Sequence, residues 1–446
     1  MIEGASNRGA NDALQIKDSE RKGFFAIAPV PIGNMFSASA LLVGATLGTG
    51  LTLADSVLAI LLGFGFVIAY MCLMVMEATD TGLPTAAFSG AALGELGARY
   101  IVSLVVGIAT LGWFGIQAAI CGQSFSLMMS DFFGFNIPAG ISTAFWGILM
   151  VVTAVYGFTA LRYLGYIAMP LLAFICVYGA VMTSNGAGGM QEIISHAPLP
   201  SAAFSLVMGV NYAVGLVAML GTTAGDFIRY SKNRKTAVLT CCAGLFPAGL
   251  AVLTMGAIMS IASGENNIAV IMTSLGLPAL GLIALVLSTW SVNAGNVFSA
   301  GLCFSVLFGG KQVKRKTATA LAGAVGVTMA VLGIFDHLSI FLNFLSACAP
   351  ALAGAIIADY WIIGKGNKDS FSIRPGFRLS GMIAFVGGTL IALATGGTFG
   401  MIPVLSFLSV PFFIGPINGL IVSVVLFVIA ESIIGKKGKN AAVNQQ

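Results

Sequence analysis

Twelve long runs of apolar residues constrain what this chain can fold into more than any other feature of its sequence. A helix that spans a bilayer needs roughly 20 mostly apolar residues, and each run is close to that length or longer. Because lipid offers no partner for backbone polar groups, we expect an all-α integral membrane protein with twelve transmembrane helices. The runs lie near residues 24–51, 55–77, 99–129, 138–158, 162–184, 203–229, 236–263, 277–308, 317–335, 337–363, 379–397 and 411–434.

The charged residues give these spans an orientation. Hydrophobic residues make up 58% of the chain and charged residues only 8%, which is typical of a membrane protein. If the N-terminus is cytoplasmic, all 21 Lys and Arg residues fall on the cytoplasmic side or at its interface, and the outer connections carry only acids. This distribution predicts a multi-pass protein of the bacterial inner (plasma) membrane with both termini in the cytoplasm. The net charge of +5 is then an insertion signal and does not indicate a nucleic-acid partner.

The first span, Phe24–Leu51, is a poor helix in its middle. It contains Pro29, Pro31 and Gly33, and three further glycines follow between residues 44 and 50. Proline and glycine weaken the helical ladder, and carbonyls left free at membrane depth must face protein, water or a solute. A broken first helix is typical of secondary transporters. The alternative is a glycine-rich helix that packs closely on its neighbours.

The sixth span has the same character. Four glycines interrupt the stretch Val207–Asp226, and this span runs through the membrane in the opposite direction to the first. Two weak helices in corresponding places of two inverted halves indicate a binding site near the midplane. We therefore expect a 5+5 inverted repeat with broken helices 1 and 6. The divisions are a cytoplasmic tail (1–23), the first half with spans 1–5 (24–184), the second half with spans 6–10 (185–364), peripheral spans 11–12 (365–435) and a cytoplasmic tail (436–446).

The deep parts of the spans offer amides, hydroxyls and an indole, and almost no ionisable groups. Trp113 and Gln117 are four residues apart and so share one helix face, where a ring can stack and an amide can bind its edge. Asn293 and Asn296 could supply further amides, although buried amides in membranes also join helices together. Without a fixed counter-charge, a small, neutral, planar, hydrogen-bonding solute fits best.

Other classes of protein lack support in the sequence. There is no P-loop, so ATP-driven transport within this chain is excluded, and no catalytic constellation, so we expect no enzyme activity. Seven cysteines lie in apolar segments and show no metal-ligand spacing with the two histidines. We expect no cofactor beyond a coupling cation, no metal beyond sodium, and no obligate protein partner.

Several short motifs occur in an order and spacing that is similar to one transporter family. They are Phe36-Ser-Ala-Ser39 followed by Thr46-Leu-Gly-Thr-Gly-Leu51, Gly112-Trp-Phe-Gly115, Asn185-Gly-Ala-Gly-Gly189, Gly225-Asp-Phe-Ile-Arg-Tyr230, Trp290-Ser-Val-Asn293 with Ser299-Ala-Gly-Leu302, and Ile356-Ile-Ala-Asp-Tyr360. Through them, roughly residues 20 to 365 resemble the bacterial cytosine permeases and the wider nucleobase–cation symporter (purine–cytosine permease) family, which includes hydantoin and allantoin carriers.

The resemblance implies an inverted-repeat fold, alternating access and residues of a substrate site. Trp113 matches the family's stacking tryptophan, and Gln117 matches a glutamine of the hydantoin branch. Phe36 and Ser37 would contribute from span one. The second aromatic wall falls near Val217, where this chain has no aromatic residue.

The resemblance also implies a sodium site. Carbonyls around Gly33 and Phe36, together with Ser288 and Ser291, match its pattern. Val292, however, stands where a second hydroxyl-bearing residue is usual, and a valine side chain offers no oxygen. Coupling to sodium and coupling to protons therefore both stay open.

Together these features predict cation-coupled import of a nucleobase such as cytosine or a purine, or of a related neutral heterocycle, by alternating access. The alternatives are an amino-acid or other small-solute symporter on the same fold, and a channel or non-transporting membrane sensor.

Overall fold

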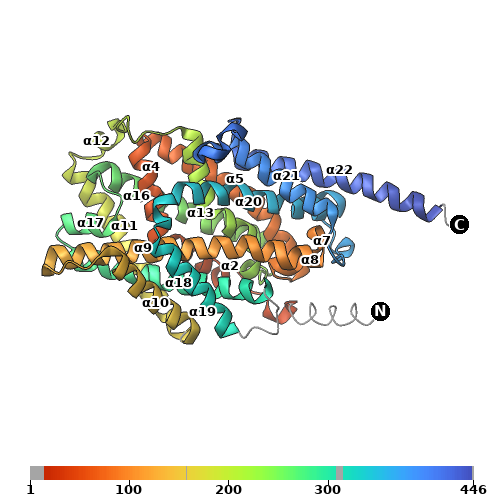
Figure 1. The fold of residues 1–446 in the computed structure, drawn as a ribbon, viewed down its shortest axis with the longest axis horizontal. Helices are drawn as coiled ribbons and strands as arrows, with labels where there is room; N and C mark the ends of the chain where they lie inside the picture. Colours follow the sequence, from red (N-terminus) through yellow and green to blue (C-terminus); the bar gives the residue numbers. More distant parts are fainter. Residues whose placement is uncertain (1–14, 157, 308–314, 444–446) are drawn as a thin grey trace.

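The computed structural model describes residues 15–156, 158–307 and 315–443, which fold into a bundle of helices (Figure 1). Within these ranges no β-strand forms, and the β-structure is limited to an isolated bridge between Lys22 and Ser231. The all-α fold expected from the apolar runs is confirmed. Arg8, Lys311 and Lys314, which belong to the charge distribution of the sequence, lie outside the described residues.

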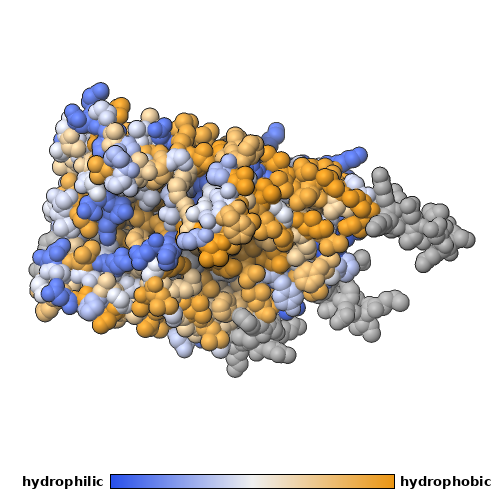
Figure 2. Space-filling model, turned by 45° about the horizontal axis from the view of Figure 1, so that its top comes forward, coloured by the Kyte–Doolittle hydropathy of each residue, from blue (hydrophilic) through white to orange (hydrophobic). Residues whose placement is uncertain are grey.

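Nine helices of the described residues are long and apolar enough to cross a membrane. Three of them, built on α9, α16 and α20, include a π-helical turn, at residues 98–102, 240–245 and 358–363. Apolar side chains cover most of the visible face of the molecule, and polar residues gather toward one end (Figure 2). The helices are α5 (Leu53–Thr81), α9 (Ser103–Phe133), α10 (Ala139–Tyr156), α11 (Phe158–Gly186), α13 (Leu206–Thr223), α16 (Phe246–Ser263), α18 (Pro278–Leu307), α20 (Leu338–Ile357) and α22 (Gly415–Val443).

The first span is a bent pair of helices. Helix α3 (Pro29–Met35) and helix α4 (Ala38–Gly50) meet at an angle of 48°, and counting them as one span brings the total to ten. Two shorter apolar helices, α19 (Arg315–Val331) and α21 (Leu379–Thr395), fall where spans nine and eleven are expected. Each predicted span thus coincides with an apolar helix, while the number that crosses a bilayer stays a prediction.

The helix pairings repeat when the span number shifts by five. Span one (α4) packs extensively on span seven (α16), and span six (α13) packs in the same way on span two (α5). Likewise α9 packs on α10 as α18 packs on α19. An inverted repeat predicts this exchange of partners, because spans one to five and six to ten then occupy equivalent places.

Span six differs from the expectation of a break among its glycines. Helix α13 is continuous from Leu206 to Thr223, and only a turn at Ala224, whose backbone angles remain helical, separates it from α14 (Gly225–Ile228). The glycines serve close packing instead. A Cβ atom on Gly215 would overlap the backbone of Leu342, and one on Gly221 would lie 2.6 Å from Val67. The interruption is therefore at one end of the span.

Glycines also allow close packing between spans one and seven. A Cβ atom on Gly44 would overlap the backbone of Leu253, and one on Gly48 would lie 2.5 Å from the carbonyl oxygen of Ala257. Small residues four apart let two helix backbones approach closely, which is the main source of attraction between helices in lipid. The bend of span one lies elsewhere, at Phe36 and Ser37, where no glycine stands.

The connections gather at the two ends of the bundle (Figure 1). Helices α6 (Thr85–Phe88), α7 (Gly90–Leu93) and α8 (Glu95–Gly97) lie in the long connection before span three, with α12 (Met190–Ser195) and α17 (Ile268–Ser274) at the opposite end. Short helices α2 (Phe24–Ile27) and α15 (Arg234–Leu239) adjoin spans one and seven. Peripheral helices α21 and α22 pack on each other and on α20, and α22 ends toward the same end of the bundle as α7 and α8.

Replacing Gly44 with Ala should destabilise the protein. The added methyl group has no room against the Leu253 backbone, and overpacking of this kind costs about 1–3 kcal/mol. Gly65→Ala is the matched control, because nothing lies within 4 Å of its Cβ position and alanine favours helix by up to about 1 kcal/mol. Thermal unfolding in detergent should show a lower midpoint for Gly44→Ala alone. Equal midpoints for the two variants would contradict the close packing of α4 on α16.

Candidate substrate and cation site

The bend between α3 and α4 is built by two residues that leave the helical conformation. Phe36 has ψ 73°, and Ser37 is extended and caps α4, because its hydroxyl accepts a hydrogen bond of 3.2 Å from the backbone N–H of Ala40. The next backbone N–H, that of Ala38, donates to Oγ of Ser288 on α18 at 3.3 Å. The structure thus brings Phe36, Ser37 and Ser288 together.

The other two candidate cation ligands lie on either side of this junction. The carbonyl oxygen of Gly33 accepts a hydrogen bond from the N–H of Phe36 at 3.1 Å, and Gly33 itself packs against Met169 of α11. Ser291 lies almost one turn beyond Ser288 on α18 and is half-buried. Within the described parts of the chain, no group of three or more His, Cys, Asp or Glu side chains could hold a metal ion. Any cation here would therefore depend on carbonyl and hydroxyl oxygens.

Trp113 of α9 forms an aromatic pair that the sequence did not reveal. Its ring meets that of Phe341 from α20 at right angles, with centroids 5.4 Å apart. Gly112 makes this possible, because a Cβ atom there would overlap the Phe341 ring. The sequence signal was limited to the Gly-Trp pair, since nothing in the sequence around Phe341 relates it to Trp113, which lies more than 200 residues earlier. The indole is partly buried, as an aromatic wall of a site should be.

Gln117 is the most informative polar side chain of this region. It is 1% exposed, and its Oε1 atom has no hydrogen-bond partner among the described residues. Leaving a buried acceptor unsatisfied costs about 1–3 kcal/mol, so such an atom is expected to meet a ligand or water. One helical turn separates Gln117 from Trp113.

Asn293 and Asn296 have partners within the protein. The amide of Asn293 is fully buried and donates to the carbonyl oxygen of Phe114 at 2.9 Å, and Asn296 donates to Oδ1 of Asn293 at 3.2 Å. The first bond holds α18 against α9 next to Trp113, and the second lies within α18. Asn293 thus makes a bond of the kind that joins helices, and the role of both asparagines in binding a substrate stays a prediction.

Val217, expected beside the second wall, lies in the packed core and is 1% exposed. Its neighbour Leu216 is only partly buried. At this place α13 thus offers aliphatic side chains, and the aromatic ring that contacts Trp113 is Phe341 of α20.

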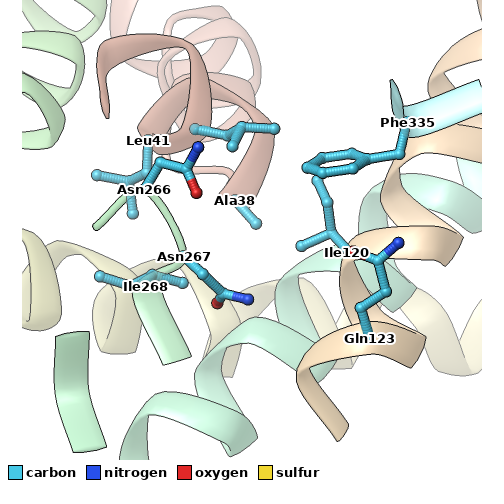
Figure 3. Close-up of a pocket in the computed structure, with 9 residues that line it drawn as sticks. Ala38, Leu41, Ile120, Gln123, Asn266, Asn267, Ile268 and Phe335 are labelled. Carbon is cyan, nitrogen blue, oxygen red and sulfur yellow. The ribbon is translucent and has the colours of Figure 1, made fainter. Parts of the chain in front are cut away.

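A pocket of about 100 Å³ lies beside the first residues of α4 (Figure 3). Ile120 of this pocket is almost one turn beyond Gln117, and Ala38 adjoins the bend of span one. Asn266 and Asn267 face α9 across the opening (Figure 3), and Asn267 is held by hydrogen bonds with Ser124. Sequence reasoning missed these polar lining residues, because the loop before α17 gave no signal. The lining comprises Ala38, Leu41, Leu42, Ile120, Gln123, Asn266, Asn267, Ile268 and Phe335.

Known proteins match this chain along most of its length. The family model for permeases for cytosine/purines, uracil, thiamine and allantoin matches residues 15–428. The cytosine permease of Escherichia coli K12 is 31% identical over 345 residues, covering 77% of this chain and 79% of that protein.

Two solved structures share the fold. An inward-facing conformation of Mhp1 has a TM-score of 0.80 at 19% identity, covering 95% of this chain and 93% of that one. Mhp1, described as a nucleobase-cation-symport-1 family transporter, in a closed conformation with bromovinylhydantoin bound has a TM-score of 0.73 at 19% identity and covers 95% of both chains.

Replacing Gln117 with Leu should weaken binding of a ring that carries an amide edge. The unpaired group on the ligand would cost about 1–3 kcal/mol, or about 5- to 150-fold in affinity. Calorimetry with cytosine, uracil and hydantoin, and with ring analogues that lack the amide, measures this. Gln191→Leu, on the exposed surface of α12, is the matched control and should bind normally. Equal losses for every ligand would mean that Gln117 supports the fold.

Proposed function

Because the chain belongs to the family of permeases for cytosine/purines, uracil, thiamine and allantoin, we propose that it imports a nucleobase or a related neutral planar heterocycle with a coupling cation. The observation that carries this proposal is the unsatisfied Oε1 atom of Gln117, one turn from Trp113. A planar ring stacked on the indole could donate an N–H to that oxygen. Both side chains are neutral, which suits an uncharged substrate.

A difference between equivalent helix pairs of the two halves supports alternating access. Helix α20 packs closely on α13, where Thr222 also donates to the carbonyl oxygen of Ala349 at 3.0 Å. The equivalent pair, five spans earlier, is α11 with α3 and α4. Among the described residues, α11 makes no comparably extensive contact there, although Gly33 touches Met169. A carrier that is closed on one side and open on the other would show this difference between its halves.

The junction of spans one and eight supports the proposal of cation coupling. Ser288 already binds the backbone at the bend, so a cation bound by Ser288, Ser291 and the carbonyls of Gly33 and Phe36 would stabilise the bend itself. A substrate that contacts the same bend would then be linked to the cation through one structural element. Sodium and protons are both candidates for this role.

The distribution of basic residues also supports a proposal for the membrane in which the protein lies and for the side on which its termini lie. In the sequence, the basic residues fall in the tails and in the connections on the same side as α7, α8 and the end of α22. These helices lie at one end of the bundle, and α12 and α17 lie at the other (Figure 1). This supports a protein of the bacterial inner membrane with both termini in the cytoplasm.

Uptake into proteoliposomes tests the proposed function. Radiolabelled cytosine, uracil, hydantoin and leucine are offered under an inward sodium gradient, under an inward proton gradient, and with neither. We expect one of the heterocycles to accumulate saturably above its external concentration under one of the gradients. Accumulation of leucine instead would indicate an amino-acid symporter. Flux without saturation or accumulation would indicate a channel, and no flux of any solute would indicate a sensor.

Trp113→Ala should lower the affinity for the transported ring by about 5- to 150-fold, because base–aromatic stacking contributes about 1–3 kcal/mol. Trp113→Phe should retain part of the affinity. The same calorimetric assay measures both, with thermal unfolding as a check on the fold. Unchanged affinity in a folded Ala variant would place the stacking site elsewhere.

Val292→Thr should strengthen the dependence of substrate binding on sodium. The added hydroxyl supplies an oxygen beside Ser291 that the natural valine lacks. Val292→Ala is the control, because it changes the side-chain volume without adding an oxygen. Substrate affinity is compared in sodium and choline buffers at two pH values. A large sodium effect in the natural protein that threonine leaves unchanged would show that Val292 does not limit the site.

A further inference from the structure

A large basic pocket lies away from the candidate substrate site, at the end of the bundle that the basic residues predict to be cytoplasmic. It has a volume of about 620 Å³ and is formed by four segments that are distant in sequence. Five basic and two acidic side chains give its lining a net charge of +3. The lining comprises Asp18, Arg21, Thr79, Asp80, Lys232, Asn233, Arg234, Lys235 and Lys368.

The two arginines of this pocket are fixed by the protein itself. Nε of Arg234 donates to both carboxylate oxygens of Asp80 at 2.9 Å, and Tyr360 donates to the same carboxylate at 2.6 Å. The guanidinium of Arg234 also lies 5.0 Å from the centre of the Trp361 ring. Arg21 donates to the carbonyl oxygens of Thr79 and Ser231, each at 3.0 Å. These contacts hold the two guanidinium groups in place at the base of the pocket.

The three lysines of this pocket are different. Lys232, Lys235 and Lys368 are exposed, and none of them forms an ion pair with the residues that the structure describes. Both acids of the lining are already engaged, Asp80 with Arg234 and Asp18 with Arg21. Three ammonium groups around one concavity therefore create a positive potential that no acid of the lining neutralises.

We propose that this pocket binds a phosphate-bearing anion, in the first place the headgroup of an anionic phospholipid. Basic pockets at the cytoplasmic ends of transmembrane helices are suited to such headgroups, because lysines near an anionic surface are attracted to it. The pocket lies where span two ends and span seven begins, which is where we expect the boundary of the bilayer.

A headgroup bound in this pocket would also affect the segment that precedes span one. The N–H of Lys22 donates to the carbonyl oxygen of Tyr230, and the N–H of Lys232 donates to that of Lys22 at 3.0 Å, so this segment lies across the end of span six. Ile16 similarly donates to the carbonyl oxygen of Gly82, at the end of span two. A headgroup that contacts Arg21, Lys232 and Lys368 would join the segment before span one to the connections that follow spans six and ten. It would thereby stabilise the position of that segment against the bundle.

The test compares phosphatidylglycerol, phosphatidylcholine and inorganic phosphate as additives to the full-length protein in neutral detergent. Native mass spectrometry measures lipid binding, and thermal unfolding measures stabilisation. The test variant carries Lys232→Gln, Lys235→Gln and Lys368→Gln. The control variant carries Arg99→Gln, Lys316→Gln and Arg374→Gln, three exposed positions outside the pocket with the same loss of charge. A circular dichroism spectrum establishes that both variants are folded.

We expect phosphatidylglycerol to bind and stabilise the natural protein and the control more than phosphatidylcholine does. The dissociation constant of the test variant should rise about 10- to 100-fold. Stabilisation by inorganic phosphate alone, lost in the same variant, would support the anion site and identify a soluble anion as its ligand. If phosphatidylglycerol binds the test variant and the control equally, the pocket is not an anion site and the proposal is wrong.

Discussion

The hydrogen bonds of the first span are the constraint on which the candidate site depends. Lipid satisfies no backbone polar group, so a bend within a transmembrane helix must find its partners in the protein. Here Ser37 caps the second helix and Ser288 accepts from Ala38. That contact places α18 beside the bend, and Asn293 of α18 then binds the carbonyl oxygen of Phe114 next to Trp113. The bend and the aromatic wall are thus connected through a single helix.

Close packing around this connection determines which parts can move. The glycines of α4 and α13 bring their backbones against α16 and α20, and contacts of this kind resist any separation. Among the described residues, α11, the counterpart of α20 in the other half, packs on α16 and α18 but makes no comparably extensive contact with α3 and α4.

Much of the fold could be predicted from the sequence. The length of each apolar run locates one span, and the basic residues beside it give that span its orientation, without knowledge of how the helices pack. The proline and glycine content of span one predicted a break, and the break lies at Phe36 and Ser37, which are neither proline nor glycine. The glycines of span six lie within a continuous helix that extends to Thr223. Sequence alone cannot distinguish a glycine that weakens a helix from one that lets the backbone of an adjacent helix pack closely. Phe341 and the lining residue Asn266 were missed for a related reason, since only the three-dimensional arrangement brings them to α9 or α4.

The central claim is that a planar substrate binds between the Trp113 ring and the bend of span one. A cryo-electron microscopy structure of the protein saturated with its best-binding heterocycle tests this most directly. The account predicts ring-shaped density parallel to the indole, with a polar edge within hydrogen-bond distance of Oε1 of Gln117. Density confined to the pocket lined by Asn266 and Phe335, or located away from Trp113, would contradict it.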